Sequence, residues 1–279
     1  DACVLRAIKR KNLEHDPVRL VRAARFLAQF PAMELDPRTA GWIQSLAPRV
    51  RRAPRERVGQ ELLALVTAGG AERGLRTLSD LGLLTRTAVC RSSCDEAWLR
   101  ANFEAASRTR PATHPLPTAL AVAGSAAPLS LLIRAWGQPH PDAIAHYAWP
   151  RVLRSHAARA ARMIDEAPAV AEGPVGDRRA FIHRAGSAFP TVLAAAAAVD
   201  PDRPWARWWR LWRVRGPSLV HPKPLLTSEE ICSILGIYPG PTLGRAVSAL
   251  TEAQVRGEIR SAAGAKSWLS RLGWGRLLR

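Results

Sequence analysis

The apolar residues of this chain recur every three or four positions along almost its whole length. In the stretch 13–26, Leu20, Ala23 and Ala24 fall on one side of a helix, and Leu27 continues that side. We find no run of alternating apolar and polar residues that would indicate a β-strand. The pattern therefore predicts an all-α, multi-helical fold.

Proline and glycine divide this pattern into segments. A first helical block is expected from about Val4 to Leu84, and its last two helices are expected to form an antiparallel hairpin. Its breaks fall at Phe30-Pro31, Ala47-Pro48, Ala53-Pro54 and Gly69-Gly70. Further helices are expected near 95–107, 117–136, 141–165, 177–198 and 203–214.

A proline-rich joint at residues 220–224 precedes a helical tail. Thr227 and Glu230 at its start have the spacing of a capping box. The chain is therefore expected to have three helical parts, with bounds at 1–85, 86–221 and 222–279.

The helix that contains the stretch 13–26 is expected to start at an Asp-Pro pair. Asp16 can cap its free amides, and Pro17 has no N–H to leave unpaired. Asp16, Arg19 and Arg22 then share the surface that the apolar residues leave. A carboxylate beside a guanidinium offers an acceptor and donors together, which can match the edge of a nucleobase. The alternative is an ordinary basic helix face.

The net charge of the chain indicates what kind of partner it binds. The chain has 279 residues, 41 of them Lys or Arg against 23 Asp or Glu, and its formal net charge is +18. Such an excess favours a polyanionic partner, nucleic acid above all. Only four of the 41 basic residues are lysine, so part of the arginine excess can reflect the nucleotide composition of the source genome.

Four cysteines show no Cys-x-x-Cys pair, which indicates neither a zinc site nor a disulfide framework. The longest apolar runs contain Gly, Ser and Pro and are too short to span a membrane, and no signal peptide opens the sequence. A reducing, cytoplasmic location without membrane contact is expected.

Two motifs suggest metal chemistry but lack the context for it. The pair His15-Asp16 has the dipeptide of metal phosphohydrolases without the further His and Asp that those sites need. Gly186-Ser187 followed by Asp200 and Asp202 has the spacing of a nucleotidyltransferase metal site, but Pro201 between the two carboxylates breaks the strand that would carry them. We interpret both as chance matches.

Four tryptophans recur at helical spacing with arginines between them. A face of this kind can stack on unpaired bases, but it is more often a seam that packs against a core. We favour the core interpretation for these residues, which are Trp205, Trp208, Trp209 and Trp212.

The stretch Leu5-Arg6-Ala7-Ile8 followed by HDPVRLVRAARF resembles the neck of class II tRNA nucleotidyltransferases and bacterial poly(A) polymerases. Members of that family add CCA, or A, to RNA 3′ ends. The resemblance implies that Asp16 and Arg19 act as a protein template and read the Watson–Crick edge of an incoming C or A. His15 stands where the family usually has an acidic residue.

Residues 54–62 are similar to a second family motif, Glu-Arg-Ile-x-x-Glu, which braces the template helix. The resemblance implies that Glu56, Arg57 and Glu61 hold arginines such as Arg19 or Arg22. Arg22 itself is expected to brace the template helix or to contact a phosphate. The alternative is a solvated charge pattern. The RNA contacts that we expect are Arg25, Arg51, Arg52 and the free amides of Leu243 and Gly244 at the start of a tail helix.

The resemblance covers roughly residues 4–85 and 222–271, and between them the chain shows no HD domain. It implies a neck (1–85), a body (86–221) and a tRNA-binding tail (222–279). In the family, Mg²⁺ is held by carboxylates of an α/β head that precedes the neck. This chain is therefore expected to bind tRNA, CTP and ATP beside a cognate head domain and to be inactive alone.

Two other functions stay open at this stage. One is a stand-alone helical RNA-binding protein without catalysis, and the other is a helical protein adaptor. The motifs are shared by CCA addition and A addition, so they do not choose between these activities.

Overall fold

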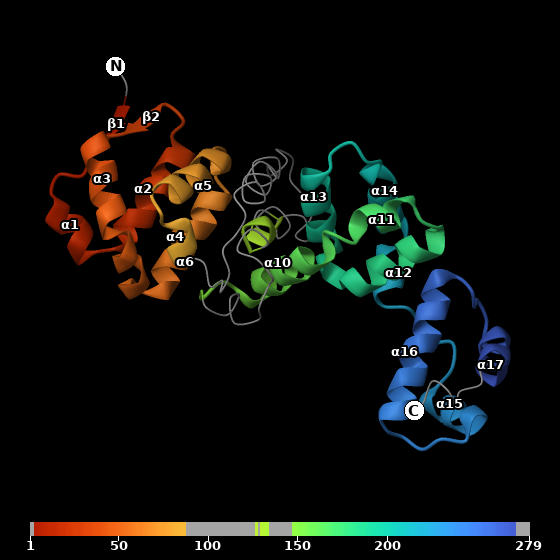
Figure 1. The fold of residues 1–279 in the computed structure, drawn as a ribbon. Coiled ribbons are helices and arrows are strands. Elements are labelled where there is room, and N and C mark those ends of the chain that lie inside the picture. The colour runs from red at the N-terminus through yellow and green to blue at the C-terminus, as the bar shows by residue number, and fades with distance from the viewer. Residues whose placement is uncertain (1–2, 88–125, 128, 134–146, 272–279) are drawn as a thin grey trace. The chain divides into compact units, whose positions relative to one another are not determined.

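The structure is a computed structural model that describes residues 3–87, 126–127, 129–133 and 147–271 (Figure 1). The regular elements of these residues are helices apart from one pair of short strands, which confirms the predicted fold class. They belong to two compact units. Unit 1 comprises Asp1–Asp165 and Ser187–Arg203, and unit 2 comprises Glu166–Gly186 and Pro204–Arg279. In the described ranges we find no helix with the length and apolar character needed to cross a membrane.

Unit 1 opens with two strands that the sequence did not predict. Strand β1 (Cys3–Leu5) pairs in parallel with β2 (Met33–Leu35), with Leu5 opposite Leu35. Three residues are too few to show an alternating pattern, and the partner lies about thirty positions away. The expectation of a helical block from Val4 is therefore wrong at its start, since the first helix begins at Arg10.

Helix α1 (Arg10–His15) leads into α2 (Val18–Gln29). The predicted inward face of α2 is confirmed, because Leu20, Ala23, Ala24 and Leu27 are all buried. The predicted cap at Asp16 is wrong. Pro17 occupies the N-cap position of α2, and no side chain caps this helix.

The rest of the first block follows the predicted breaks. It consists of α3 (Pro37–Leu46), the 3-10 helix η1 (Ala47–Arg52), α4 (Arg55–Val66), α5 (Ala71–Asp80) and α6 (Leu84–Thr87). Asp36 caps α3 by accepting a hydrogen bond from the Thr39 amide.

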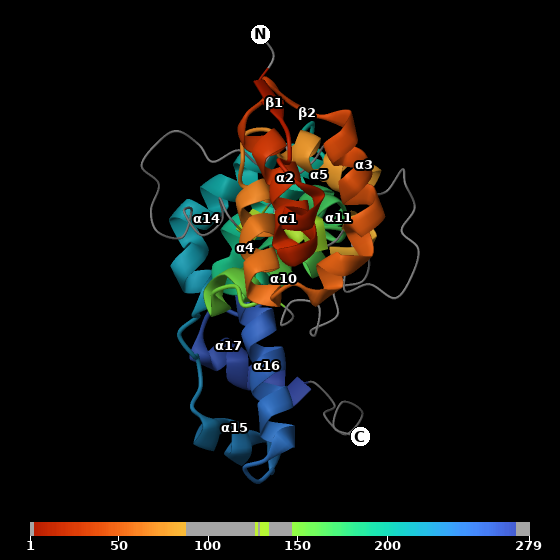
Figure 2. The same ribbon diagram turned by 90° about the vertical axis from the view of Figure 1, so that its left-hand side faces the viewer.

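Helix α2 packs against both α4 and α5 (Figure 2). The contact with the start of α5 is close. The Gly70 amide donates to the carbonyl of Ala28, and a Cβ on Gly70 would lie 2.6 Å from that oxygen. A side chain at this position would push the two helices apart.

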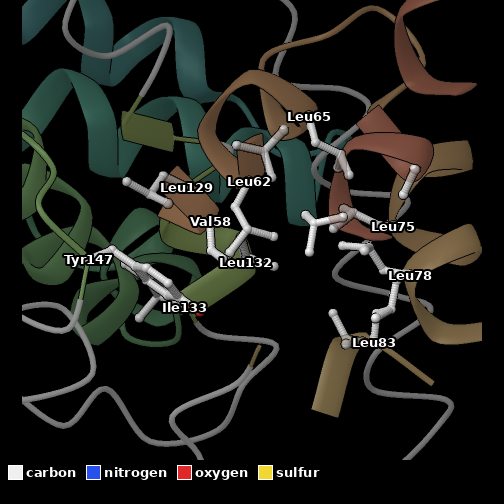
Figure 3. Close-up of a cluster of buried hydrophobic side chains, with 14 of the residues drawn as sticks. Val58, Leu62, Leu65, Leu75, Leu78, Leu83, Leu129, Leu132, Ile133 and Tyr147 are labelled. Atoms are coloured by element: carbon white, nitrogen blue, oxygen red, sulfur yellow. The ribbon is translucent and has the colours of Figure 1, made fainter. Parts of the chain in front are cut away.

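The core of unit 1 gathers around α4 (Figure 3). In that view Val58 and Leu62 lie between Leu75 of α5 on one side and Leu129 and Tyr147 on the other. Residues 129–133 are helical, and Tyr147 follows them in the described chain. The first helical block is thus covered by residues that lie far from it in sequence.

Unit 1 ends with α10 (Arg151–Met163) and α13 (Phe189–Val199), which pack together. The helix predicted at 141–165 is confirmed from Arg151 onward. The single helix predicted at 177–198 is wrong, because the chain turns at Gly186, whose φ is 58°. The helix predicted at 95–107 lies outside the described residues.

Unit 2 has α11 (Ala167–Glu172), α12 (Val175–Ala185), α14 (Trp205–Val220), α15 (Ser228–Leu235), α16 (Pro241–Arg256) and α17 (Ala262–Arg271). Helix α12 contacts α14 and α16. The capping box of Thr227 and Glu230 is confirmed. A small core joins α15, α16 and α17 through side chains that include Ile231, Leu250 and Leu269.

The tryptophan face of α14 is only partly a core seam. Trp205 and Trp208 are buried, and Trp208 meets the ring of Phe181 edge on at 5.1 Å between centroids. Trp209 and Trp212 are half-buried. The core interpretation therefore holds for the first two residues of the four.

Candidate nucleotide and RNA site

Asp16 lies in the turn between α1 and α2 and is held by an arginine of α4. Arg57 donates from Nη1 to Oδ1 at 3.2 Å and from Nη2 to Oδ2 at 3.0 Å. Arg19, the second residue of α2, donates from Nε to Oδ2 at 3.4 Å. Partial burial raises the pKa of Asp16, but the two guanidiniums outweigh it and hold that pKa below its usual value. The carboxylate is therefore ionised and fixed in direction.

A second carboxylate anchors the next two arginines of α2. Glu61 of α4 is buried, and both Nε and Nη2 of Arg22 lie 2.7 Å from its Oε1. Arg25 Nε lies 2.6 Å from Oε2 without the alignment of a hydrogen bond. Two guanidiniums beside one buried carboxylate fix the rotation of α2 against α4.

The bracing expected from the second motif differs in detail from the observed contacts. Glu61 holds Arg22 as expected and Arg25 in addition. Arg57 binds a carboxylate, and Arg19 is held by Asp16 instead of by a glutamate. Glu56 is exposed, and in the described part of the chain no ion pair involves it. The motif alone did not reveal these partners because they depend on how α2 packs against α4.

A cavity of 310 Å³ opens beside the outward face of α2. Arg19, Arg22 and Phe26 of that helix line it, together with Leu13 of α1 and Thr39 of α3. Its volume is in the range of small-molecule pockets, and its wall combines an aromatic ring with guanidiniums. A flat, polar-edged molecule such as a nucleobase suits this wall.

Sequence reasoning missed three of these lining residues, namely Leu13, Phe26 and Thr39. Each comes from a different helix, so no local spacing links them. The Thr39 hydroxyl accepts the Ala7 amide at 3.0 Å and donates to Asp36 at 2.8 Å. It thereby fixes the segment between β1 and α1 at the rim of the cavity.

The arginines expected to contact RNA lie in different settings. Arg51 and Arg52 are exposed on η1. Arg25 is mostly covered, and its Nη1 donates to Gln29 at 2.8 Å. His15, which stands in an acidic position of the family motif, is exposed.

The two tail amides are not equivalent. Leu243 and Gly244 both lie in the first turn of α16, but the Gly244 amide donates to the Gly240 carbonyl at 3.3 Å. The expectation that both amides are free is therefore wrong for Gly244, because the helix already takes up its N–H.

The Mg²⁺ ligands implied by the family resemblance are carboxylates of a head domain and not residues of this chain. Within the ranges that the structure describes, no three His, Cys, Asp or Glu side chains come together in a group that could hold a metal ion.

Comparisons with known proteins find a family model of polymerase A and two similar tRNA nucleotidyltransferases. Residues 32–87, from just before β2 to α6, match a family model described as "Probable RNA and SrmB- binding site of polymerase A". The chain is 27% identical to an A-adding tRNA nucleotidyltransferase of Deinococcus radiodurans, over 96% of this chain and 71% of that protein. It is 28% identical to a CC-adding tRNA nucleotidyltransferase of Geobacter sulfurreducens, over 96% of this chain and 66% of that protein.

Solved structures show the same fold. The Bacillus stearothermophilus CCA-adding enzyme in complex with CTP aligns with a TM-score of 0.69 and 20% identity, and the match covers 99% of this chain and 67% of that one. The Thermotoga maritima CCA-adding enzyme complexed with tRNA aligns with a TM-score of 0.55 and 14% identity, over 96% of this chain and 64% of that one.

Proposed function

The chain belongs to the class II tRNA nucleotidyltransferase family, and from that premise we propose that it selects the nucleotide and holds the RNA in an enzyme that adds CCA or A to RNA 3′ ends. Residues 1–85 are the neck that reads the base, 86–221 the body and 222–279 the tail that grips tRNA. We place this activity in the cytoplasm.

The observation that carries the proposal is the fixed pair of Asp16 and Arg19, of which Arg19 lines the cavity. An ionised carboxylate has about four acceptor sites, and Arg57 and Arg19 occupy three of them. One acceptor is left for an exocyclic amino group. Arg19 uses one of its donors and keeps the others for a ring nitrogen.

This arrangement of donors and acceptors distinguishes the bases. C and A both present an amino donor beside a ring acceptor on the Watson–Crick edge, whereas U and G present a carbonyl beside a ring N–H. Asp16 and Arg19 therefore match C and A and oppose U and G. A good bidentate match is worth about 1–3 kcal/mol of discrimination.

The transfer of a nucleotidyl group from CTP or ATP needs Mg²⁺, which neutralises charge on the phosphates. Among the described residues, no three His, Cys, Asp or Glu side chains form a group that could hold a metal ion. We assign the metal to a cognate head domain, as the family resemblance implies. The part of this chain is to orient the base and hold the RNA.

The test measures single-nucleotide incorporation of each of the four triphosphates on a tRNA that ends before CCA, with a cognate head fused or added in trans. Asp16→Ala and Arg19→Ala should lower the preference for C and A over U and G about tenfold or more, because either change removes half of the match. Arg51→Ala is the control, since its exposed side chain lies on η1 away from the cavity lining.

The control should weaken tRNA binding and leave the base preference unchanged. If Asp16→Ala and Arg19→Ala lower tRNA affinity but keep the base preference, the base-reading role is wrong. A basic helix face would then be the better interpretation of α2.

A stand-alone RNA-binding protein is the second candidate function. The net charge of +18 and the match of residues 32–87 to an RNA-binding family model favour it equally. It predicts salt-dependent tRNA binding and no base preference under any combination with a head domain, so the same incorporation assay separates the two.

A further inference from the structure

Unit 2 contains a second cavity, of 450 Å³, where α12, α14 and the end of α16 meet. Three arginines from different elements line it. They are Arg179 of α12, Arg215 of α14 and Arg260, which follows α16. None of the described lining residues is acidic. The cavity is therefore a concave surface of one sign of charge.

Two other arginines of unit 2 are paired with carboxylates. Arg256 donates to Asp177 and lies 3.1 Å from Glu252, and Arg184 pairs with Glu166. For the three arginines of the cavity, the described residues provide no ion pair. Like charges that converge without a counter-charge repel one another, and a bound anion relieves that repulsion.

The cavity is shaped before any ligand enters it. Gly257 ends α16 with a φ of 89°, and a Cβ there would lie 2.7 Å from Nη1 of Arg179. Glycine thus supplies both the left-handed turn and the room for the guanidinium. The ion pair between Arg256 and Asp177 fixes α16 against α12.

The arginines keep donors for a ligand. Arg260 donates from Nε to the Gly257 carbonyl at 3.3 Å, which leaves the terminal nitrogens of its guanidinium for other partners. The Ser218 hydroxyl and the Gln254 side chain add polar groups to the wall. Planar guanidinium forks match phosphate oxygens in pairs.

We propose that this cavity binds a phosphate group of an RNA backbone. The proposal rests on the proposed function, which makes RNA the partner, and adds a defined phosphate site in unit 2 that is distinct from the base-reading site of unit 1. The competing explanation is that Arg179 and Arg260 only cover the carbonyl end of α16, where cations are favoured without a ligand.

The test compares charge-removing variants with a matched control on the same helix. Arg179→Gln and Arg215→Gln each remove one cavity guanidinium. Arg213→Gln removes the same charge from α14 at an exposed position outside the cavity. Binding of unmodified tRNA to the full chain is measured between about 50 and 200 mM salt, and far-UV circular dichroism verifies the fold of each variant.

The slope of log affinity against log salt should fall by about 1 for each cavity variant, because one phosphate contact is lost. The slope of Arg213→Gln should stay within a few tenths of that of the unchanged chain. Inorganic phosphate should compete with tRNA only in the millimolar range, since a single phosphate lacks the rest of the RNA.

Three outcomes would overturn the proposal. Cavity variants that keep the salt slope of the unchanged chain, with tRNA binding intact, overturn this site and leave the proposed function in place. Micromolar binding of inorganic phosphate without an effect on tRNA would assign the cavity to a free anion instead. If the unchanged chain binds no tRNA, both the RNA part of the proposed function and this site fail.

Discussion

Arg57 donates both terminal nitrogens of its guanidinium to the two oxygens of Asp16, although the two residues lie 41 positions apart in sequence. The direction of the Asp16 carboxylate is therefore set by α4 as well as by the neighbouring Arg19 of α2. A side chain that reads a base must keep its direction, because a shift of about 1 Å is enough to lose a hydrogen bond.

The first prediction concerns this clamp. Arg57→Lys keeps the positive charge but replaces a planar fork by a single ammonium group, which cannot hold both oxygens in one plane. With a head domain present, we expect the preference for C and A over U and G to fall several-fold, while tRNA affinity changes less than twofold. Incorporation of the four triphosphates and a tRNA titration measure the two effects separately.

Arg55→Lys serves as the matched control. Arg55 is the first residue of α4 and is exposed, and the same exchange there should leave base preference unchanged. Equal changes in base preference for both variants would show that Arg57 acts through general charge and not by orienting Asp16.

The second prediction concerns the buried carboxylate of Glu61. Glu61→Gln removes the charge that faces Arg22 and Arg25 and leaves two guanidiniums without a counter-charge, so the free energy of unfolding should fall by about 1–3 kcal/mol. Glu72→Gln breaks an exposed pair with Arg76 and should cost no more than about 0.5 kcal/mol. Urea denaturation of both variants gives the comparison, and similar losses would argue against a structural role for Glu61.

The third prediction uses two glycines in opposite settings. A Cβ on Gly59 would lie 2.8 Å from Cβ of Tyr147, and the Gly59 carbonyl accepts the indole N–H of Trp149. Gly59→Ala should therefore lower the free energy of unfolding by about 1–3 kcal/mol through overpacking.

Gly41 provides the counterpart for that substitution. It lies on the exposed side of α3, and a Cβ added there would have no neighbouring atom within 4 Å, so Gly41→Ala should raise the free energy of unfolding by about 0.5–1 kcal/mol. Thermal melts of the two variants should shift in opposite directions. A shift of both in the same direction would contradict the close packing of α4 against Tyr147.

The fourth prediction is a pH dependence of stability. His156 of α10 is buried, its Nδ1 has no hydrogen-bond partner in the described chain, and its Nε2 lies 3.3 Å from the Ser187 hydroxyl. Burial, and secondarily the charge of Arg159, lower the pKa of His156 below its usual value of 6.5. The unfolded chain therefore takes up a proton at a pH where the folded chain resists it.

The sign follows from linkage. The contribution of His156 is complete above about pH 6.5 and is lost as the pH falls through the window below that value. Urea midpoints at pH 7.5 and 5.5 should differ for the unchanged chain, and His156→Gln should reduce the difference. His221→Gln, at a position closer to solvent, should not. An unchanged difference in His156→Gln would exclude this residue as the cause.

Local periodicity was sufficient to predict the buried face of α2, the proximity of Asp16 to Arg19 and the breaks between the first helices. Those features depend on residues within one or two turns of each other. The partner of Asp16 was not predictable in the same way, because Arg57 reaches it only through the packing of α4 on α2. The pairing of β1 with β2 and the cavity lined by Leu13 and Thr39 depend on equally distant residues.

Helix α2 is fastened at both of its ends, by Arg57 on Asp16 at its start and by the close approach of Gly70 to Ala28 at its finish. Arg22 and Arg25 add to this attachment through Glu61, whereas Arg19, which lines the cavity, is bound only to Asp16 at 3.4 Å among the contacts described above. Under the proposed function, exchange of Arg19 therefore changes the preferred base while the helix stays in place. Under the proposed function, a new nucleotide preference then needs few substitutions and no repacking of the scaffold.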